Sequence, residues 1–339
     1  MKPVGILAAS HYVPERVLTN KELEEKLDTT DEWIRSRTGI HERRVASDNE
    51  TTASLGTVAA LRVLEKAGCA AEELDLIIVA TMTPDSILPA ISCRVQAELG
   101  AKNAGAFDVS IACSGFTYAL ALGCGYVACG LARKVLVVGA DVMSRVMNWN
   151  DRGTCVLFGD GAGAVLLGEV QEGYGLLAQE LGSDGQGAEH LRIPAGAGAH
   201  PVGEDGLVPQ DFTLQMNGRE VFRFAVQVMG NAAVRAAEKA GIRPDEIDLF
   251  IPHQANSRII EAAAKRLDLS DEKVFVNLQR YGNTSCASIP LALSEALEEG
   301  RIREGSKVVL VGFGGGLAWG ALVFRWGGVS SSDAKAGAA

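Results

Sequence analysis

The sequence repeats itself at one fixed offset, and this repeat restricts the possible folds more than any other feature. Residues 59–76 (AALRVLEKAGCAAEELDL) align with residues 232–249 (AAVRAAEKAGIRPDEIDL), which lie 173 positions later. The same offset places KVLVVGAD (134–141) on KVVLVGFG (307–314), and Cys113 on Cys286. Because one offset aligns three separate segments, the chain is predicted to contain a duplicated structural unit.

Each copy of the repeat has the pattern of an α/β unit, in which a helix, a buried strand, a loop, a second helix and a second buried strand follow one another. The strands LDLIIVAT (74–81) and IDLFIPH (247–253) are apolar on both faces. This is typical of parallel strands that are covered by helices on either side. The helix expected over 114–132 is apolar around nearly its whole circumference, so we place it in the centre of the molecule.

The repeat divides the chain into an N-terminal half, residues 1–173, and a C-terminal half, residues 174–328. The tail 329–339 consists of small and polar residues without a pattern and is predicted to be disordered. The Gly-rich segment 182–206 is interpreted as a surface excursion. The segment FGDGAGAVLLG (158–168) is interpreted as a tight hairpin, because it lacks the ending of a phosphate-binding loop.

Charge and cysteine content argue against several classes of partner. With 42 acidic and 32 basic residues, the net charge of −10 disfavours binding to nucleic acid or to an anionic membrane. No apolar run approaches the roughly 18 residues of a membrane span. The N-terminal apolar run is too short for a signal peptide, so we expect a cytoplasmic protein. The seven cysteines lie mostly in apolar sequence, so we expect reduced thiols. Cys113, Cys124 and Cys129 have no familiar zinc spacing and no nearby His, so we expect no metal site.

Cys113 is the best candidate for a nucleophile. It follows a short β-branched run in DVSIACSGF (108–116) and precedes the long apolar helix. Unpaired N–H groups and the helix dipole stabilise a thiolate at a helix N-terminus, so we expect the pKa of Cys113 to fall below the free value of about 8.5. The alternative is a buried structural cysteine.

His253 and Asn283 are candidates for polar partners of this thiol. His253 follows a buried strand, at the edge where parallel sheets place their ligands, and Asn283 lies in the loop before the repeated helix. Either residue could instead have a local role, as a structural hydrogen-bonding group or as a cap. The glycines at 314–316 could expose backbone N–H groups and complete an oxyanion hole with the Cys113 N–H.

Six motifs together resemble the β-ketoacyl-acyl-carrier-protein synthase III family of the thiolase-like superfamily. They are DTTDEWIRSRTGI (28–40), DVSIACSGF (108–116), DRGTCVLFGDGAGA (151–164), IPHQANSRI (251–259), YGNTSCASIPLAL (281–293) and GFGGGLAWG (312–320). The resemblance covers nearly the whole chain. It implies an α/β, thiolase-like fold in which the two duplicated halves pack as a five-layered αβαβα sandwich.

The resemblance also implies a reaction. Cys113 would take an acyl group from acyl-coenzyme A in a ping-pong mechanism, and malonyl-acyl carrier protein would then lose carbon dioxide and attack it. His253 and Asn283 would stabilise the enolate, and the N–H groups of Cys113 and Gly316 would form the oxyanion hole. No metal or redox cofactor is implied. The alternative is a related acyltransferase or condensing enzyme of secondary metabolism with the same site.

Further roles are carried over residue by residue. The resemblance implies that Leu88 lies in a segment that caps the acyl pocket across a homodimer interface, where the family often has an aromatic residue. A leucine leaves more room than a phenyl ring, so the starter choice stays open between acetyl and longer or more branched acyl groups. The alternatives are a core position for Phe222, a helix cap at Thr30 or Asp31, and a solvated charged face in place of a docking surface. Coenzyme A binding is implied for Thr29, Trp33, Arg37, Arg152, Gly218, Phe222 and Asn256, and docking of the carrier protein for Arg258, Lys265 and Arg266.

Overall fold

Two sheets form the frame of the molecule. The computed structural model describes residues 1–195 and 209–329. The first sheet has the order β1 (Val4–Tyr12), β7 (Asp160–Glu169), β6 (Val135–Val142), β4 (Leu76–Ala80) and β5 (Gly105–Val109). The second has the order β11 (Leu249–Pro252), β12 (Lys307–Gly314), β13 (Ala318–Arg325) and β8 (Gly175–Ser183).

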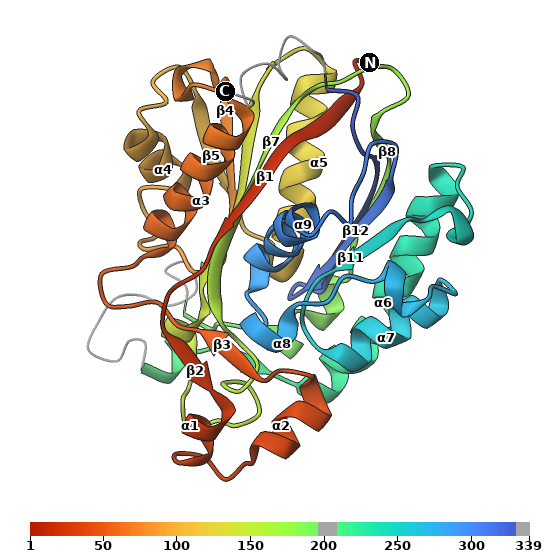
Figure 1. Ribbon diagram of the computed structural model, residues 1–339. Helices are drawn as coiled ribbons and strands as arrows, with labels where there is room; N and C mark the ends of the chain where they lie inside the picture. Colours follow the sequence, from red (N-terminus) through yellow and green to blue (C-terminus); the bar gives the residue numbers. More distant parts are fainter. Residues whose placement is uncertain (196–208, 330–339) are drawn as a thin grey trace.

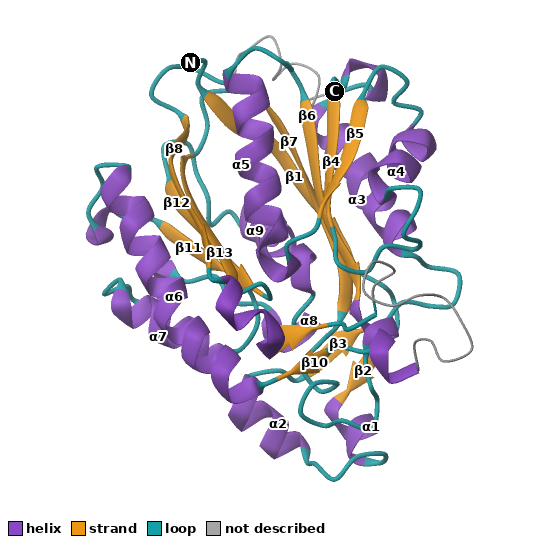
Figure 2. Cartoon of the chain, turned by 180° about the vertical axis from the view of Figure 1, so that it is seen from behind, coloured by secondary structure: helices purple, strands orange, loops and turns teal. Residues whose placement is uncertain are grey.

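Helices cover both faces of each sheet, and together they make five layers (Figure 2). The central layer lies between the sheets and contains α5 (Gly115–Ala128) and α9 (Ser288–Glu298). The outer layers are α3 (Thr52–Ala67) with α4 (Ile91–Leu99) on the first sheet, and α6 (Gly218–Lys239) with α7 (Ser257–Arg266) on the second. The expected αβαβα sandwich is therefore confirmed, including the central position of the apolar helix.

The duplication is visible in the direction and start of each element. β4 runs parallel to β5 and β6, and β11 runs parallel to β12, whereas β7 and β13 are antiparallel to their neighbours. Short 3-10 turns, η2 (Ala112–Ser114) and η8 (Ser285–Ala287), precede the two central helices at the offset found in the sequence. The first residue of each turn has a positive φ, 47° at Ala112 and 50° at Ser285. The division at residue 173 as a domain boundary stays a prediction.

Smaller elements complete the chain and bring the N-terminal segment to the site. Thr30 caps α2 (Asp31–Thr38), because its hydroxyl accepts a hydrogen bond from the Trp33 N–H, as the capping interpretation expected. The smaller elements of the chain are β2 (Val17–Thr19), α1 (Asn20–Glu24), α2 (Asp31–Thr38), β3 (Glu42–Arg44), η1 (Ala71–Glu73), η3 (Met143–Val146), η4 (Gly185–His190), β9 (Leu191–Arg192), η5 (Pro209–Phe212), β10 (Gln215–Met216), η6 (Pro244–Glu246), η7 (Asp271–Lys273) and α8 (Leu278–Tyr281).

The interpretation of 158–168 as a hairpin was wrong, because Asp160–Glu169 is the continuous strand β7. Its glycines serve close packing instead of a turn. A Cβ on Gly163 would lie 2.8 Å from the Leu291 backbone nitrogen, and a Cβ on Gly139 in β6 would lie 2.3 Å from the Cys286 carbonyl oxygen. Glycines in these two strands therefore let η8 and the start of α9 approach the first sheet closely.

The predicted surface excursion, 182–206, and the predicted disordered tail, 329–339, lie partly outside the described residues. Segment 182–206 ends β8 and continues through η4 and β9, and its residues 196–206 lie outside the described ranges. The same holds for residues 330–339 of the predicted disordered tail. Within the described ranges, no helix has the length and apolar character needed to cross a bilayer.

Candidate active site

One pocket, of about 560 Å³, brings Cys113, His253 and Asn283 together. They come from three places: the turn before α5, the end of β11, and the segment before η8. The rest of the lining is mainly apolar. It consists of Leu157, Phe158, Leu191, Met216, Gly218, Val221, Phe222, Ala255, Asn256, Ile259, Phe313 and Gly314.

Cys113 lies in η2, two residues before α5, and is buried. The backbone of Gly314 packs directly against it, since a Cβ on Gly314 would lie 2.7 Å from the Cys113 nitrogen. Burial raises the pKa of the Cys113 thiol to about 12, and a hydrogen bond from the Ser285 hydroxyl opposes this effect. The expected lowering of this pKa was therefore wrong, because the loss of hydration on burial outweighs the effect of the helix N-terminus.

His253 continues β11 and is fixed by contacts on both sides of its ring. Its backbone N–H donates to the Val311 carbonyl at 2.7 Å, and its Nδ1 lies 2.6 Å from the Ser288 hydroxyl on α9. The Phe313 ring meets the imidazole edge to face, with 5.3 Å between the centroids. Burial lowers the pKa of His253 to about 3, so the ring is neutral. When Ser288 donates to Nδ1, the proton of the imidazole is on Nε2.

Asn283 is fixed through its backbone and its side-chain oxygen. Its N–H donates to the Leu157 carbonyl at 2.8 Å, and its carbonyl accepts from the Gly159 N–H at 3.0 Å. Its Oδ1 accepts from the Ser285 N–H at 2.8 Å, which leaves the Nδ2 amine as the donor of this side chain. This local bond matches the alternative of a local structural role, so Asn283 shapes the loop and also lines the pocket.

Asp141 is a buried residue that sequence reasoning missed. Its Oδ2 accepts from the Cys286 N–H at 2.9 Å, and its Oδ1 accepts from Met82 N and from the hydroxyls of Thr81 and Thr83 at 2.8–3.0 Å. The carboxylate thus fixes η8 to the end of β4. Asp141 could have been noticed in the sequence as a charged residue at the end of the otherwise apolar strand segment KVLVVGAD.

Arg152 and Trp33 lie at the surface and face one another, with 5.5 Å between the guanidinium carbon and the indole centroid. The Arg37 carbonyl accepts from the Asn256 amide at 3.0 Å, which ties α2 to the pocket lining. Thr29 has a buried hydroxyl oxygen without a hydrogen-bond partner among the described residues. Of the seven predicted coenzyme A residues, Gly218, Phe222 and Asn256 line the pocket, whereas Thr29, Trp33, Arg37 and Arg152 do not.

The remaining predicted residues lie at separate places. Arg258 stacks on Phe222 beside the pocket, 5.1 Å from its ring centroid, while Phe222 also packs on the core of the second sheet, as the alternative interpretation expected. Lys265 and Arg266 line a shallow hollow between α6 and α7. Leu88 is 84% exposed and does not line the pocket of its own chain. Gly316 lies two residues beyond Gly314, the last pocket-lining residue of this segment, and has φ 133°.

No group of three or more His, Cys, Asp or Glu side chains among the described residues is arranged to hold a metal ion. The chemistry available is that of one thiol, two neutral N–H donors and backbone amides. Such a set can form a thioester on the sulfur and can stabilise an enolate beside it.

Comparisons with known proteins agree with this arrangement. Residues 107–185 match the family model of 3-oxoacyl-[acyl-carrier-protein (ACP)] synthase III, and residues 237–326 match the model of its C-terminal region. A curated β-ketoacyl-[acyl-carrier-protein] synthase III from Symbiobacterium thermophilum is 52% identical over 327 residues, 96% of this chain and 99% of the relative. One from Caldanaerobacter subterraneus subsp. tengcongensis is 51% identical over 95% and 97%.

Solved structures show the same relationship. The β-ketoacyl-[acyl carrier protein] synthase III of Thermus thermophilus superposes with a TM-score of 0.90 at 53% identity, over 96% of this chain and 100% of that chain. The priming β-ketosynthase of the R1128 polyketide pathway has a TM-score of 0.89 at 37% identity, over 96% and 97%. The polyketide enzyme is less similar to this chain than the Thermus enzyme, 37% against 53% identity, so the comparison does not favour the secondary-metabolism alternative. The chain belongs to the 3-oxoacyl-[acyl-carrier-protein] synthase III family and is a thiolase-like condensing acyltransferase of fatty acid biosynthesis.

Proposed function

We propose that this pocket joins an acyl-coenzyme A starter to malonyl-acyl carrier protein by decarboxylative condensation. The observation that carries the proposal is the lining of one pocket by a single thiol and two neutral donors, Cys113, His253 and Asn283. No group in this set is suited to abstract a carbon-bound proton, and a decarboxylation requires none. The reaction needs hydrogen-bond donors that stabilise the negative charge of the enolate beside the acylated Cys113 sulfur.

In the first step, the Cys113 sulfur attacks the thioester carbonyl and expels coenzyme A. The thiol proton leaves with coenzyme A, so the charges balance. The raised pKa of Cys113 means that the thiol carries its proton when this step begins. The helix N-terminus and the Ser285 hydroxyl stabilise the sulfur as charge develops on it. The oxyanion is assigned to the N–H groups of Cys113 and Gly316, and the close packing of the Gly314 backbone on Cys113 supports this assignment.

In the second step, the malonyl thioester oxygen accepts hydrogen bonds from His253 Nε2 and Asn283 Nδ2. Loss of carbon dioxide leaves the electron pair on the enolate, which attacks the acyl carbonyl on Cys113. Collapse of that intermediate releases the Cys113 thiolate, which is then reprotonated. The low pKa of His253 supports this role, because the ring stays neutral and keeps one donor. Neither step needs a metal or a redox cofactor.

Coenzyme A is assigned to a path from the surface into the pocket. Arg152 and Trp33 offer two flat faces for an adenine, since a guanidinium plane stacks on aromatic rings. Thr29, with its unpartnered buried hydroxyl, offers a hydrogen bond near the same end, and Arg37 adds a positive charge. Gly218, Phe222 and Asn256 line the deeper part that would hold the pantetheine chain.

The carrier protein and a second copy of the chain are the proposed macromolecular partners. Arg258, beside the pocket, and Lys265 and Arg266, further along α7, offer positive charge to an acidic carrier protein. Ile87 and Leu88 are 85% and 84% exposed, which supports burial in a homodimer where Leu88 would cap the partner's acyl pocket. All seven cysteines are free thiols, which supports a cytoplasmic location.

The experiment that tests this proposal separates the two steps. Asn283→Ala should form acyl-Cys113 from acetyl- or isobutyryl-coenzyme A at close to the wild-type rate, because the nucleophile is intact. Condensation with malonyl-acyl carrier protein should fall by about 10²–10³-fold, the effect of losing one oxyanion donor. Intact-mass and peptide-mass measurements would follow the acyl group, and a label on any residue other than Cys113 would overturn the assignment.

A further inference from the structure

We propose that Glu295 is a positioning residue that holds His253 and Asn283 at the separation that one shared thioester oxygen requires. The inference rests on the proposed roles of these two donors. They come from different elements, β11 and the segment before η8, so their relative position depends on contacts between those elements. Glu295 lies on α9, two turns beyond Ser288, and does not line the pocket.

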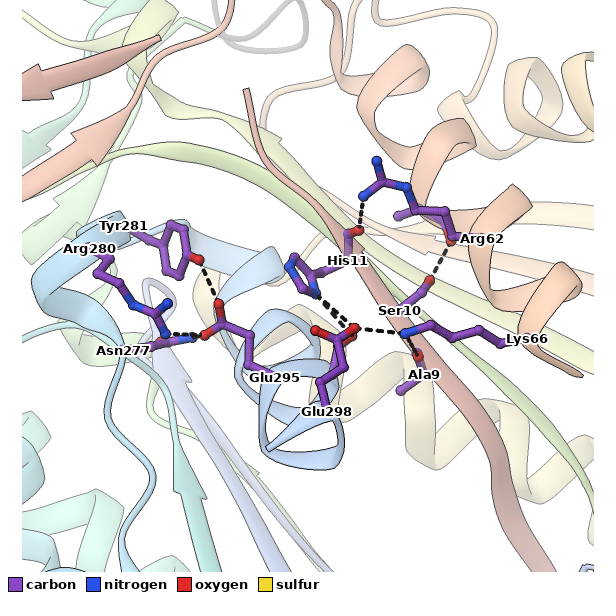
Figure 3. A network of polar contacts seen from close by, with 12 residues as sticks. Ala9, Ser10, His11, Arg62, Lys66, Asn277, Arg280, Tyr281, Glu295 and Glu298 are labelled. Atoms are coloured by element: carbon purple, nitrogen blue, oxygen red, sulfur yellow. Dashed lines mark hydrogen bonds and ion pairs between the residues drawn. The ribbon is translucent and has the colours of Figure 1, made fainter. Parts of the chain in front are cut away.

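Three side chains from one short segment converge on the Glu295 carboxylate (Figure 3). Oε2 accepts from Asn277 Nδ2 and from Arg280 Nη2, each at 2.8 Å, and Oε1 accepts from the Tyr281 hydroxyl at 2.5 Å. Burial, followed by this hydrogen bond, raises the pKa of Tyr281 to about 12, so the phenol keeps its proton and donates. Glu295 is only 6% exposed, and we call this cluster of Glu295, Asn277, Arg280 and Tyr281 the Glu295 brace.

One arm of the Glu295 brace leads to His253. The backbone N–H of Asn277 donates to Gln254 Oε1 at 3.0 Å, and Gln254 directly follows His253 in the chain. The Gln254 amide also donates to the Phe275 carbonyl at 3.1 Å and to the Pro252 carbonyl at 2.8 Å. Asn277 therefore contacts Glu295 through its side chain and the His253 segment through its backbone.

The other arm leads to Asn283. Tyr281 is followed by Gly282, whose φ of 63° turns the chain into Asn283. A Cβ on Gly282 would lie 2.8 Å from the Leu157 carbonyl oxygen, the group that accepts the Asn283 N–H. The Tyr281 ring, fixed by Glu295, thus sets the start of this turn. A small shift of the turn would move the Asn283 amide in the pocket.

The helix itself joins the two arms. Ser288, the first residue of α9, bonds to His253 Nδ1 at 2.6 Å, and Glu295 on the same helix holds the segment that precedes Asn283. One rigid element therefore contacts both donors. No contact of the Glu295 brace reaches Cys113, which belongs to η2 and the first half of the chain.

Glu298 provides a matched control on the next turn of α9. It is also an acceptor of a charged hydrogen bond, from Lys66 Nζ at 2.7 Å, and it lies 4.0 Å from His11 Nδ1 (Figure 3). These partners belong to α3 and β1, away from both donors. A substitution of Glu298 removes a carboxylate and an ion pair without touching the Glu295 brace.

The test compares Glu295→Gln, Glu295→Ala and Glu298→Gln in two assays on the full-length enzyme. The first follows acyl-Cys113 formation from acyl-coenzyme A by rapid-quench intact mass. The second follows release of carbon dioxide and product when pre-acylated enzyme meets malonyl-acyl carrier protein. Glu295→Ala should lower the second rate by about 100-fold, the cost of a displacement of about 1 Å. It should change the first rate by less than about threefold.

Glu295→Gln, which keeps the shape and one acceptor oxygen, should lower condensation by an intermediate factor of about 10-fold. Glu298→Gln should change both rates by less than about threefold. An equal fall of both rates in Glu295→Gln, or the same split in Glu298→Gln, would overturn the inference and leave a purely structural role. If Glu295→Ala does not fold, the glutamine variant decides. Failure of the proposed function would be seen separately, as wild-type enzyme acylated at another residue.

Discussion

The two central helices and the turns before them have the same backbone and different chemistry. Ala112 and Ser285 share a positive φ, and the two turns and two helices begin 173 residues apart. In the second half, His253, Ser288 and Glu295 are polar, whereas the equivalent positions in the first half hold Ala80, Gly115 and Leu122. The duplicated fold supplies two similar places, and the side-chain donors proposed to stabilise the enolate both lie in the second half. The first half holds the proposed nucleophile, Cys113.

Cys113 and Cys286 show the difference between the two halves most directly, because both are buried thiols at equivalent positions of the repeat. Cys286 donates its thiol hydrogen to the Ala112 carbonyl at 3.0 Å and does not line the pocket. Burial, with the charge of Asp141, raises its pKa well above the ordinary value. Access to the pocket, rather than position in the repeat, distinguishes the proposed nucleophile, Cys113, from Cys286.

The largest expected effect separates these two thiols. Cys113→Ala should abolish acyl transfer, a loss of at least about 10³-fold, because no other pocket-lining group can form the thioester. Cys286→Ala should retain acyl transfer within about threefold. The measurement is the acylated mass fraction after incubation with acyl-coenzyme A. Acylation that persists in Cys113→Ala and disappears in Cys286→Ala would reverse the comparison.

An intermediate effect is expected within the second half. Ser288→Ala removes the donor to His253 Nδ1 and with it the preference for a proton on Nε2, so condensation should fall by about 10-fold. Ser294→Ala is the control, because Ser294 lies on the same helix and bonds a different histidine, His11, at 2.9 Å. Steady-state kcat for condensation is the readout. Equal losses in both variants would show that the effect comes from the helix and not from the His253 tautomer.

The smallest expected effect concerns pH. The pKa of His253 is about 3 in the folded chain and about 6.5 when unfolded, so the unfolded state binds the extra proton between these values. Stability is therefore full above about pH 6.5 and falls as the pH drops toward 3. Between pH 7.5 and 5.5 this single group should cost about 1.4 kcal/mol of unfolding free energy.

Urea unfolding at these two pH values measures the predicted difference. His253→Gln should lose less stability than the wild type on acidification, by about 1.4 kcal/mol, because the titrating group is gone. The equivalent residue of the first half, Ala80, offers no such group. An identical loss in the variant and the wild type would show that other groups account for the acid sensitivity.

Local patterns in the sequence were enough to predict much of the fold. The repeat and the apolar strands predicted the two α/β units, the layers and the central helix, because these follow from periodicity and burial. The placement of Cys113, His253 and Asn283 at equivalent edges predicted that they meet, since strand ends and helix starts converge there. The comparisons then established the family.

Features that depend on contacts distant in sequence were missed. The raised pKa of Cys113 comes from burial by other parts of the chain, and no local signal carries it. The strand β7 was mistaken for a hairpin, because glycines that make room for α9 look the same in sequence as glycines of a turn. Glu295 reads as a surface charge near the end of a helix, and its partners appear only when the chain is folded.

The protonated state of the resting Cys113 has a consequence for encounters with electrophiles. A neutral, buried thiol is a poor target for peroxide and for small alkylating reagents, since the thiolate is the reactive species. A covalent inhibitor would have to resemble the natural substrate closely enough to promote loss of the Cys113 proton. Only then could its electrophilic group react with the sulfur.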